Sequence, residues 1–118
     1  MDLDLQTSQS GGRTVLTVEG DLDVLTAPQL RDRLLAITDR GREQIVVDLR
    51  STEFVDSSGL SALVTGLKRA RAGGGDLVLV CPPGNIRRLI EIAALDRVLV
   101  LHDDLDGLTG PTGPTSGA

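Results

Sequence analysis

The residues that could do chemistry in this sequence gather in one short stretch, residues 56–59, which read Asp-Ser-Ser-Gly. This stretch stands where a buried segment gives way to an amphipathic one, so the hydroxyls of Ser57 and Ser58 are predicted at the N-terminus of a helix. Free backbone N–H groups and the positive end of the helix dipole favour an anion there. A phosphate on one serine would add about −1.5 to −2 of charge without breaking the helix. The alternative is that one serine serves only as the N-cap of the helix.

The residues beside the two serines are candidates for shaping the site or contacting a partner. Asp56 is expected to orient the start of the helix rather than to act as a catalytic base, and its carboxylate would repel a nearby phosphate. Gly59 has no side chain, so it is expected to leave room for the backbone of another protein. Leu60 and Ser61 follow in the first turn of the predicted helix and are expected to touch a partner.

Other nucleophiles, bases and metal ligands are scarce. A hydrolase with one of the motif serines as nucleophile is the enzymatic alternative, but the sequence has no Gly-x-Ser-x-Gly motif. Its one possible base, His102, stands beside a Gly/Pro-rich tail with no evident group to orient it. The single cysteine, Cys81, ends an apolar run and is interpreted as a small hydrophobic residue. One cysteine and one histidine exclude the usual zinc sites, so we expect no enzyme, metal or cofactor.

Charge and composition argue against nucleic acid and membrane partners. Twelve basic and 17 acidic residues give a net charge of −5, which disfavours binding to a phosphate backbone. Phe54 is the only aromatic residue, so base-stacking platforms are missing. No apolar run approaches the about 18 residues of a membrane helix, and the opening Met-Asp-Leu-Asp does not resemble a signal peptide. We therefore expect a cytoplasmic monomer that binds neither nucleic acid nor membrane.

The apolar pattern places the motif serines in a single α/β domain with the element order β-β-α-β-α-β-α-β. Strands that alternate with helices at this spacing favour a largely parallel sheet, which the opening hairpin makes mixed. Thr26 and Asn85 are the predicted N-caps of the first and third helices. The predicted strands cover residues 3–7, 14–19, 44–49, 77–80 and 98–101, with a loop at 20–23 and a connection at 54–55. The domain is assigned to residues 1–106, and residues 107–118, rich in Gly, Pro and Thr, are predicted to be disordered.

Three of these stretches together resemble a known family. They are Gly-Asp-Leu-Asp at 20–23, Ile-Val-Val-Asp-Leu at 45–49 and Phe-Val-Asp-Ser-Ser-Gly-Leu at 54–60. The chain is similar to STAS domains, and specifically to bacterial anti-sigma factor antagonists, from about Leu3 to Leu101. The resemblance implies a STAS fold, in which a mixed, mostly parallel sheet is flanked by helices. Family members usually close with a fourth helix after the last strand, and here that helix is expected to be short or missing.

The resemblance also implies a phosphorylation switch. The unmodified protein would bind an anti-sigma factor that is also a serine kinase of the histidine-kinase-like ATPase class, and this binding would free the sigma factor. The kinase would end the binding by phosphorylating a motif serine, and a metal-dependent serine phosphatase would reverse the modification. By position, Ser58 is the expected acceptor, and Ser57 is the alternative.

Two further aspartates are implied to lie near the acceptor serine. Asp23 and Asp21, in the predicted loop at 20–23, would shape recognition by the kinase together with Asp56 and the residues that follow the serines. For Asp21, service as a turn residue is an open alternative. The remaining alternative function is that of a STAS subunit in another signalling scaffold or in a lipid transport machine.

Overall fold

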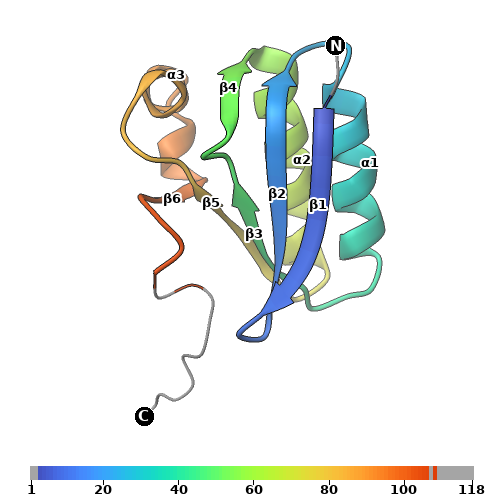
Figure 1. Cartoon of the computed structure of the whole chain (residues 1–118). Coiled ribbons are helices and arrows are strands. Elements are labelled where there is room, and N and C mark those ends of the chain that lie inside the picture. Colours follow the sequence, from blue (N-terminus) through green and yellow to red (C-terminus); the bar gives the residue numbers. More distant parts are fainter. Residues whose placement is uncertain (1–2, 107, 109–118) are drawn as a thin grey trace.

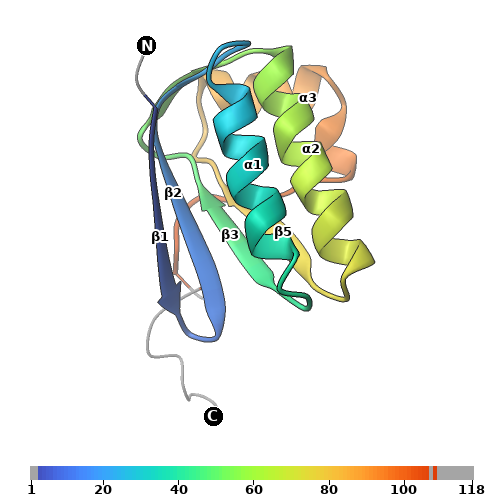
Figure 2. The ribbon, with the colours of Figure 1, turned by 90° about the vertical axis from the view of Figure 1, so that its right-hand side faces the viewer.

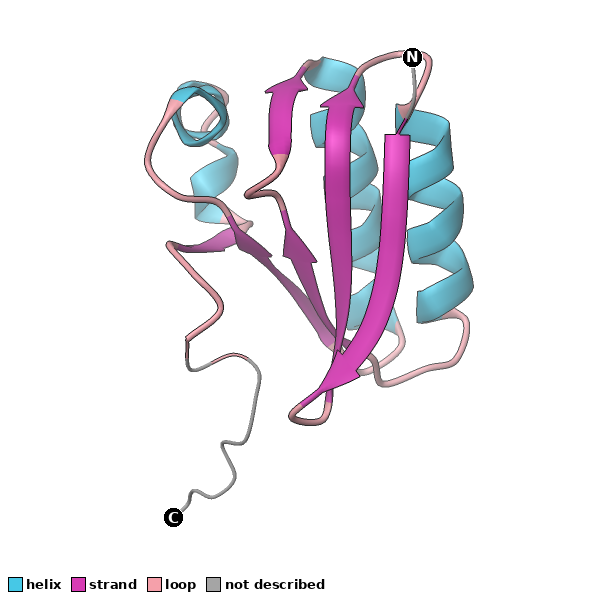
Figure 3. Cartoon of the chain, viewed as in Figure 1, coloured by secondary structure: helices cyan, strands magenta, loops and turns pink. Residues whose placement is uncertain are grey.

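Strands and helices alternate along most of the chain and assemble into one sheet with helices packed beside it (Figures 1 and 3). The computed structural model describes residues 3–106 and 108. In that part of the chain the elements are β1 (Leu3–Ser10), β2 (Arg13–Leu22), α1 (Ala27–Thr38), β3 (Gln44–Asp48), β4 (Thr52–Val55), α2 (Ser57–Ala72), β5 (Asp76–Val80), α3 (Asn85–Ile92), the short 3-10 helix η1 (Leu95–Arg97) and β6 (Val100–His102). Each predicted strand and helix is present, and β4 and η1 are additional.

The sheet is mixed and mostly parallel, which confirms the predicted fold class. Its strands follow the order β1-β2-β3-β5-β6, and β4 pairs with β2 beside this path. Only β1 and β2 are antiparallel among the pairs described. Gly11 and Gly12 join these two strands at φ angles of 59° and 78°, a two-residue turn that glycine adopts without steric penalty.

Apolar side chains pack against both faces of the sheet. Helices α1 and α2 lie side by side over one face (Figure 2), where leucines from strands and helices form the main core. This core includes Leu16, Leu22, Leu30, Leu34, Leu63, Leu67, Leu77 and Leu79. The opposite face carries a smaller cluster made of Val15, Val46, Val78, Val80, Leu105 and Leu108. Because both faces are covered, β3 is apolar throughout residues 45–47 and β5 throughout residues 77–80, with no alternation of apolar and polar residues.

The predicted connection at 54–55 is wrong, and the predicted loop at 20–23 is correct only at Asp23. Strand β2 continues to Leu22, and its last residues pair in parallel with β4 after a register shift between Gly20 and Asp21. Asp21 lies opposite Phe54, so it is a strand residue rather than a turn residue. Strand β4 is short and carries the charged Glu53, so it shows no periodic pattern of apolar residues. It is a strand because its backbone pairs with β2.

Two predicted caps and the last strand also differ in detail. Thr26 occupies the predicted N-cap position of α1, but its side chain makes no capping hydrogen bond. Asn85 is the first residue of α3, and Gly84 occupies the N-cap position. The last strand is shifted toward the C-terminus because residues 95–97 form η1 first. After β6, the described residues 103–106 and 108 form bends and turns, with no helix among them.

The predicted tail at 107–118 lies outside the described residues except for Leu108. That residue is buried in the cluster on the second face of the sheet.

Candidate functional site

The two motif segments lie side by side because the strands that lead into them are paired. β2 and β4 run in parallel, and Leu22 is in register with Val55. The backbone N–H of Asp56 then donates to the carbonyl oxygen of Leu22 at 3.0 Å, which fixes the start of α2 to the end of β2. The sheet therefore places the loop after β2 next to the N-terminus of α2.

Asp56, and not a serine, caps helix α2. Its Oδ1 accepts hydrogen bonds from the backbone N–H groups of Ser58 at 2.8 Å and Gly59 at 3.2 Å. The expectation that Asp56 orients the start of the helix is confirmed, and the alternative that a serine is the N-cap is wrong. Neither serine hydroxyl makes a hydrogen bond to another of the described residues. Ser57 is exposed and Ser58 is half-buried, so both hydroxyls are available for chemistry.

Gly59 has a packing role that the sequence interpretation missed. A Cβ at this position would lie 2.8 Å from Leu22 Cβ and 2.9 Å from Val55 Cγ1. The absent side chain thus makes room for the protein's own strand ends, and the idea that it leaves space for a partner's backbone is wrong. Leu60 is buried in the core at 6% exposure, which leaves its side chain little surface to offer a partner, whereas Ser61 is exposed.

Asp23 and Thr26 organise the neighbouring loop before α1. Asp23 Oδ1 accepts from the backbone N–H groups of Leu25 at 2.9 Å and Thr26 at 3.0 Å. The Thr26 hydroxyl is buried, donates to the carbonyl oxygen of Asp21 at 2.6 Å and accepts from the backbone N–H of Asp23 at 2.9 Å. Desolvation alone would raise the pKa of Asp23, but the bonds from Thr26 and Leu25 outweigh it, so this pKa lies below its ordinary value.

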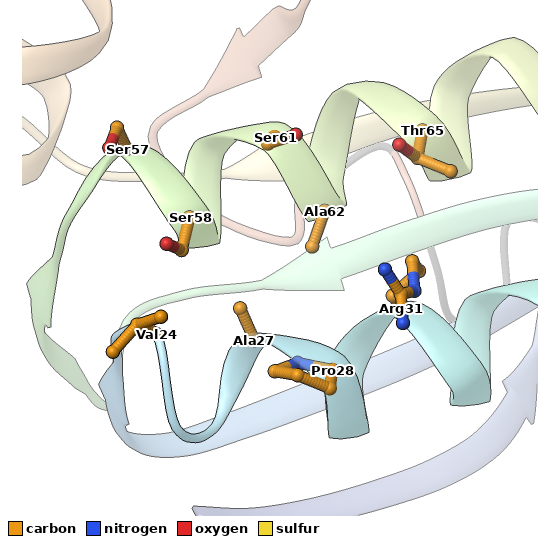
Figure 4. Close-up of a pocket in the computed structure, with 9 residues that line it drawn as sticks. All are labelled: Val24, Ala27, Pro28, Arg31, Ser57, Ser58, Ser61, Ala62 and Thr65. Carbon is orange, nitrogen blue, oxygen red and sulfur yellow. The ribbon is translucent and has the colours of Figure 1, made fainter.

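A groove of about 450 Å³ separates the N-terminal turns of α1 and α2 (Figure 4). The residues that line it are Val24, Ala27, Pro28, Arg31, Ser57, Ser58, Ser61, Ala62 and Thr65. Four of them carry hydroxyls, all on α2, and Arg31 is the only charged residue in the lining. Both predicted acceptor serines therefore line one groove, and Arg31 is a member of the site that no sequence pattern indicated.

Exposed apolar side chains stand on the segments that lead into α1 and α2, and one of them, Val24, lines the groove. Val24 is 67% exposed, Leu25 is 71% exposed and Phe54 is 50% exposed. Val24 and Leu25 occupy the loop that leads into α1, and Phe54 lies on β4 just before Asp56. Apolar residues are ordinarily assigned to the core, so the sequence pattern around these three residues did not indicate that they are on the surface.

The remaining chemical candidates lie away from the groove. His102 is on β6, beyond β3 and β5 from the end of β2, and it is not among the residues that line the groove. Cys81 is buried, and desolvation raises the pKa of its thiol, which keeps it protonated. Among the described residues, no three His, Cys, Asp or Glu side chains gather in a way that could hold a metal ion.

Comparison with known proteins defines the class to which this fold and site belong. Residues 4–108 match the family model of the STAS domain, so the chain belongs to the STAS domain family. The chain is 29% identical over 103 residues to "Anti-sigma-B factor antagonist" of Staphylococcus aureus (strain NCTC 8325 / PS 47), covering 87% of this chain and 95% of that protein. It is also 29% identical over 107 residues to "Anti-sigma F factor antagonist" of Paenibacillus polymyxa, covering 88% and 90% of the two chains.

A solved structure supports the same relationship. The crystal structure of an anti-sigma factor antagonist from Mycobacterium paratuberculosis superposes with a TM-score of 0.81 at 28% sequence identity, covering 89% of each chain. In the part of our chain that the structure describes, no helix is both long and apolar enough to span a bilayer.

Proposed function

We propose that this protein is an anti-sigma factor antagonist whose binding is controlled by phosphorylation at the start of α2. In its unmodified form it binds an anti-sigma factor and so releases a sigma factor. Membership of the STAS family and similarity to proteins named as such antagonists support the general function. The observation that carries the switch is that Asp56 caps α2, which leaves the hydroxyls of Ser57 and Ser58 unused at the surface.

The exposed apolar side chains around the groove supply the docking surface in this proposal. The side chains of Val24, Leu25 and Phe54 are each at least half exposed. Burying them against a partner would remove apolar surface from water, which is favourable. Such anchors contribute most of the affinity when they enter pockets on the partner. Because Val24 also lines the groove, the same partner surface would cover the serines.

A phosphate at this position opposes docking for an electrostatic reason. The carboxylate of Asp23 already stands in the turn before α1, and that of Asp56 at the start of α2. A phosphoserine adds about −1.5 to −2 of charge, and burying that charge under an apolar partner surface removes its hydration. Modification therefore weakens binding without any need to unfold α2, since the helix start favours an anion on its own.

We assign the acceptor role to Ser58, with Ser57 as the alternative. The kinase is the anti-sigma factor itself, of the histidine-kinase-like ATPase class, and a serine phosphatase restores the unmodified form. In this proposal the kinase recognises a surface that includes Asp21, Asp23 and Ser61. A hydrolytic role for the serines finds no support in the geometry, because His102 does not line the groove.

The direct test is phosphorylation by the anti-sigma kinase encoded in the same genome. The purified chain is incubated with this kinase and ATP, and the modified peptide is mapped by mass spectrometry. We expect one phosphate, lost in Ser58→Ala and retained in Ser57→Ala, with Ser61→Ala as the matched control one turn further along α2. Phosphate that persists in Ser58→Ala and disappears in Ser57→Ala would move the acceptor by one residue, and phosphate on neither serine would contradict the proposal.

A further inference from the structure

Arg31 is the one cationic side chain that faces the groove with the serines. It lines the groove from α1, while Ser58, Ser61 and Thr65 line it from α2. In Figure 4, the Ser58 side chain points from α2 toward α1, and Arg31 lies on α1 farther along the groove, across from Ala62 and Thr65. The two side chains thus belong to opposite walls of one groove.

The guanidinium of Arg31 has no strong partner of its own. Its ion pair is with the adjacent Asp32, where Nε and Oδ1 are 3.9 Å apart and the side chains are 51% and 76% exposed. Exposed pairs of this kind contribute little. By contrast, Arg33 on the same helix donates to the hydroxyl of Thr7 on β1, and Arg50 forms a two-point contact with Asp48. Arg31 is therefore free to take a better anion.

The helical spacing brings Arg31 within reach of the start of α2. Arg31 follows Ala27 by four residues, a rise of about 6 Å along the axis of α1. Ala27 and Val24 line the end of the groove where Ser58 lies (Figure 4). Arginine has a long flexible stem, and a phosphate on Ser58 would extend from α2 into the groove toward it. The intervening wall on α2 is Ala62, which is small and leaves the path open.

We propose that Arg31 binds the phosphate of phosphorylated Ser58 across the groove. The inference rests on the proposed function, in that it concerns the modified form of that site. A guanidinium can give two parallel N–H···O bonds to a phosphate, which are stronger than bonds between neutral groups. Its charge offsets the repulsion from Asp23 and Asp56. Phosphorylation would then both add charge at the docking surface and tie α1 to α2 over the groove, replacing the arrangement that the partner binds.

The test uses phosphoserine placed at position 58 during translation, so that no kinase is needed. The pKa of the second phosphate ionisation is measured by 31P NMR titration. In Arg31→Gln we expect this pKa to rise by about 0.75, the change that one unit charge about 4 Å away produces in water. Arg31→Lys should keep most of the lowered value because it keeps the charge. Arg33→Gln, the matched control on the same helix, should leave it unchanged. Asp21, Asp23 and Asp56 are present in all these variants, so their effect cancels.

A second readout separates a bound phosphate from a distant charge effect. The Nε–H signal of Arg31 in a 1H–15N spectrum should move when Ser58 carries phosphate, while that of Arg33 should not. An equal phosphate pKa in the native and Arg31→Gln proteins, or an Arg31 signal that ignores the modification, would overturn the inference. If the anti-sigma kinase fails to modify the protein but the pKa shift is present, the proposed function fails and the role of Arg31 stands.

Discussion

The turn that leads into α1 and the first turn of α2 share one hydrogen-bond pattern and present different surfaces. Asp23 and Asp56 each accept from the backbone N–H groups two and three residues later. The third residue after each aspartate is buried, Thr26 in one case and Gly59 in the other. The first and second residues lie at the surface in both. At α1 these are Val24 and Leu25, and at α2 they are Ser57 and Ser58.

This comparison explains why one side of the groove suits docking and the other suits modification. In the turn before α1 and in the first turn of α2, an aspartate accepts the backbone N–H groups two and three residues later, so the two side chains next to it are not needed for these hydrogen bonds. At α1 those positions carry apolar side chains, which suit docking. At α2 they carry hydroxyls, which suit reversible modification. By contrast, the Thr26 hydroxyl at the third position is consumed by the fold. A hydroxyl at a helix start is therefore available only where a neighbour does the capping.

The largest effect of breaking this arrangement is expected at the buried glycine. In Gly59→Ala, the new Cβ would press on Leu22 and Val55, so the start of α2 must shift away from the strands. We expect a loss of about 2 kcal/mol in the free energy of unfolding, in line with overpacking of a filled core. Urea denaturation followed by circular dichroism measures it. A change within about 0.5 kcal/mol is what we expect for an exposed position such as Ser61→Ala. The same small change in Gly59→Ala would contradict close packing of this residue against Leu22 and Val55.

A smaller effect is expected from the hydroxyl that the fold uses. Thr26→Val keeps the shape of the side chain but leaves the carbonyl oxygen of Asp21 and the N–H of Asp23 without this partner. We expect a loss of about 1.5 kcal/mol, because unsatisfied buried groups are costly. Ser58→Ala, the matched change at α2, should stay within about 0.5 kcal/mol. Both free energies of unfolding are measured by urea denaturation. Equal losses in the two variants would contradict the idea that the fold uses the Thr26 hydroxyl and not the Ser58 hydroxyl.

The smallest effect is a dependence of stability on pH that belongs to the α1 loop. The pKa of Asp23 is lower in the folded protein than its ordinary value, so its charged form is favoured by folding. Its contribution is present above about pH 4 and is lost as the pH falls through the folded pKa. We expect Asp23→Asn to flatten the decline of the melting temperature as the pH falls below about 4. An unchanged acid profile in this variant would mean that the loop hydrogen bonds do not favour the carboxylate.

The strongly periodic elements were predictable from the sequence, and the short strand that positions the site was not. Apolar residues at helical spacing define α2, and short continuous apolar runs define β3 and β5, without help from the rest of the chain. Strand β4 has only four residues, one of them charged, and Phe54 on it is exposed, so no pattern marked it. The extension of β2 was hidden for the same reason, since Gly20 and Asp21 favour turns until β4 pairs with them.

The site itself was predictable in location and not in detail. The Asp-Ser-Ser-Gly stretch was enough to place two serines at a helix start, and they are there. Which residue caps the helix could not be decided, because aspartate and serine are both good N-caps and only the fold chooses between them. The groove, Arg31 and the exposed Val24 depend on how α1 and α2 pack against each other, which local sequence does not encode.

The most direct measurement is the affinity of the anti-sigma partner for the protein with and without phosphate on Ser58, by isothermal titration calorimetry. Phosphoserine placed at position 58 should weaken binding at least about tenfold, which corresponds to about 1.4 kcal/mol. Phosphoserine at position 8, on β1 and outside the groove, adds the same charge elsewhere and should change the affinity less than about twofold. Equal affinity for the unmodified and the Ser58-phosphorylated protein would contradict the switch, and equal weakening by both phosphates would deny the start of α2 any special role.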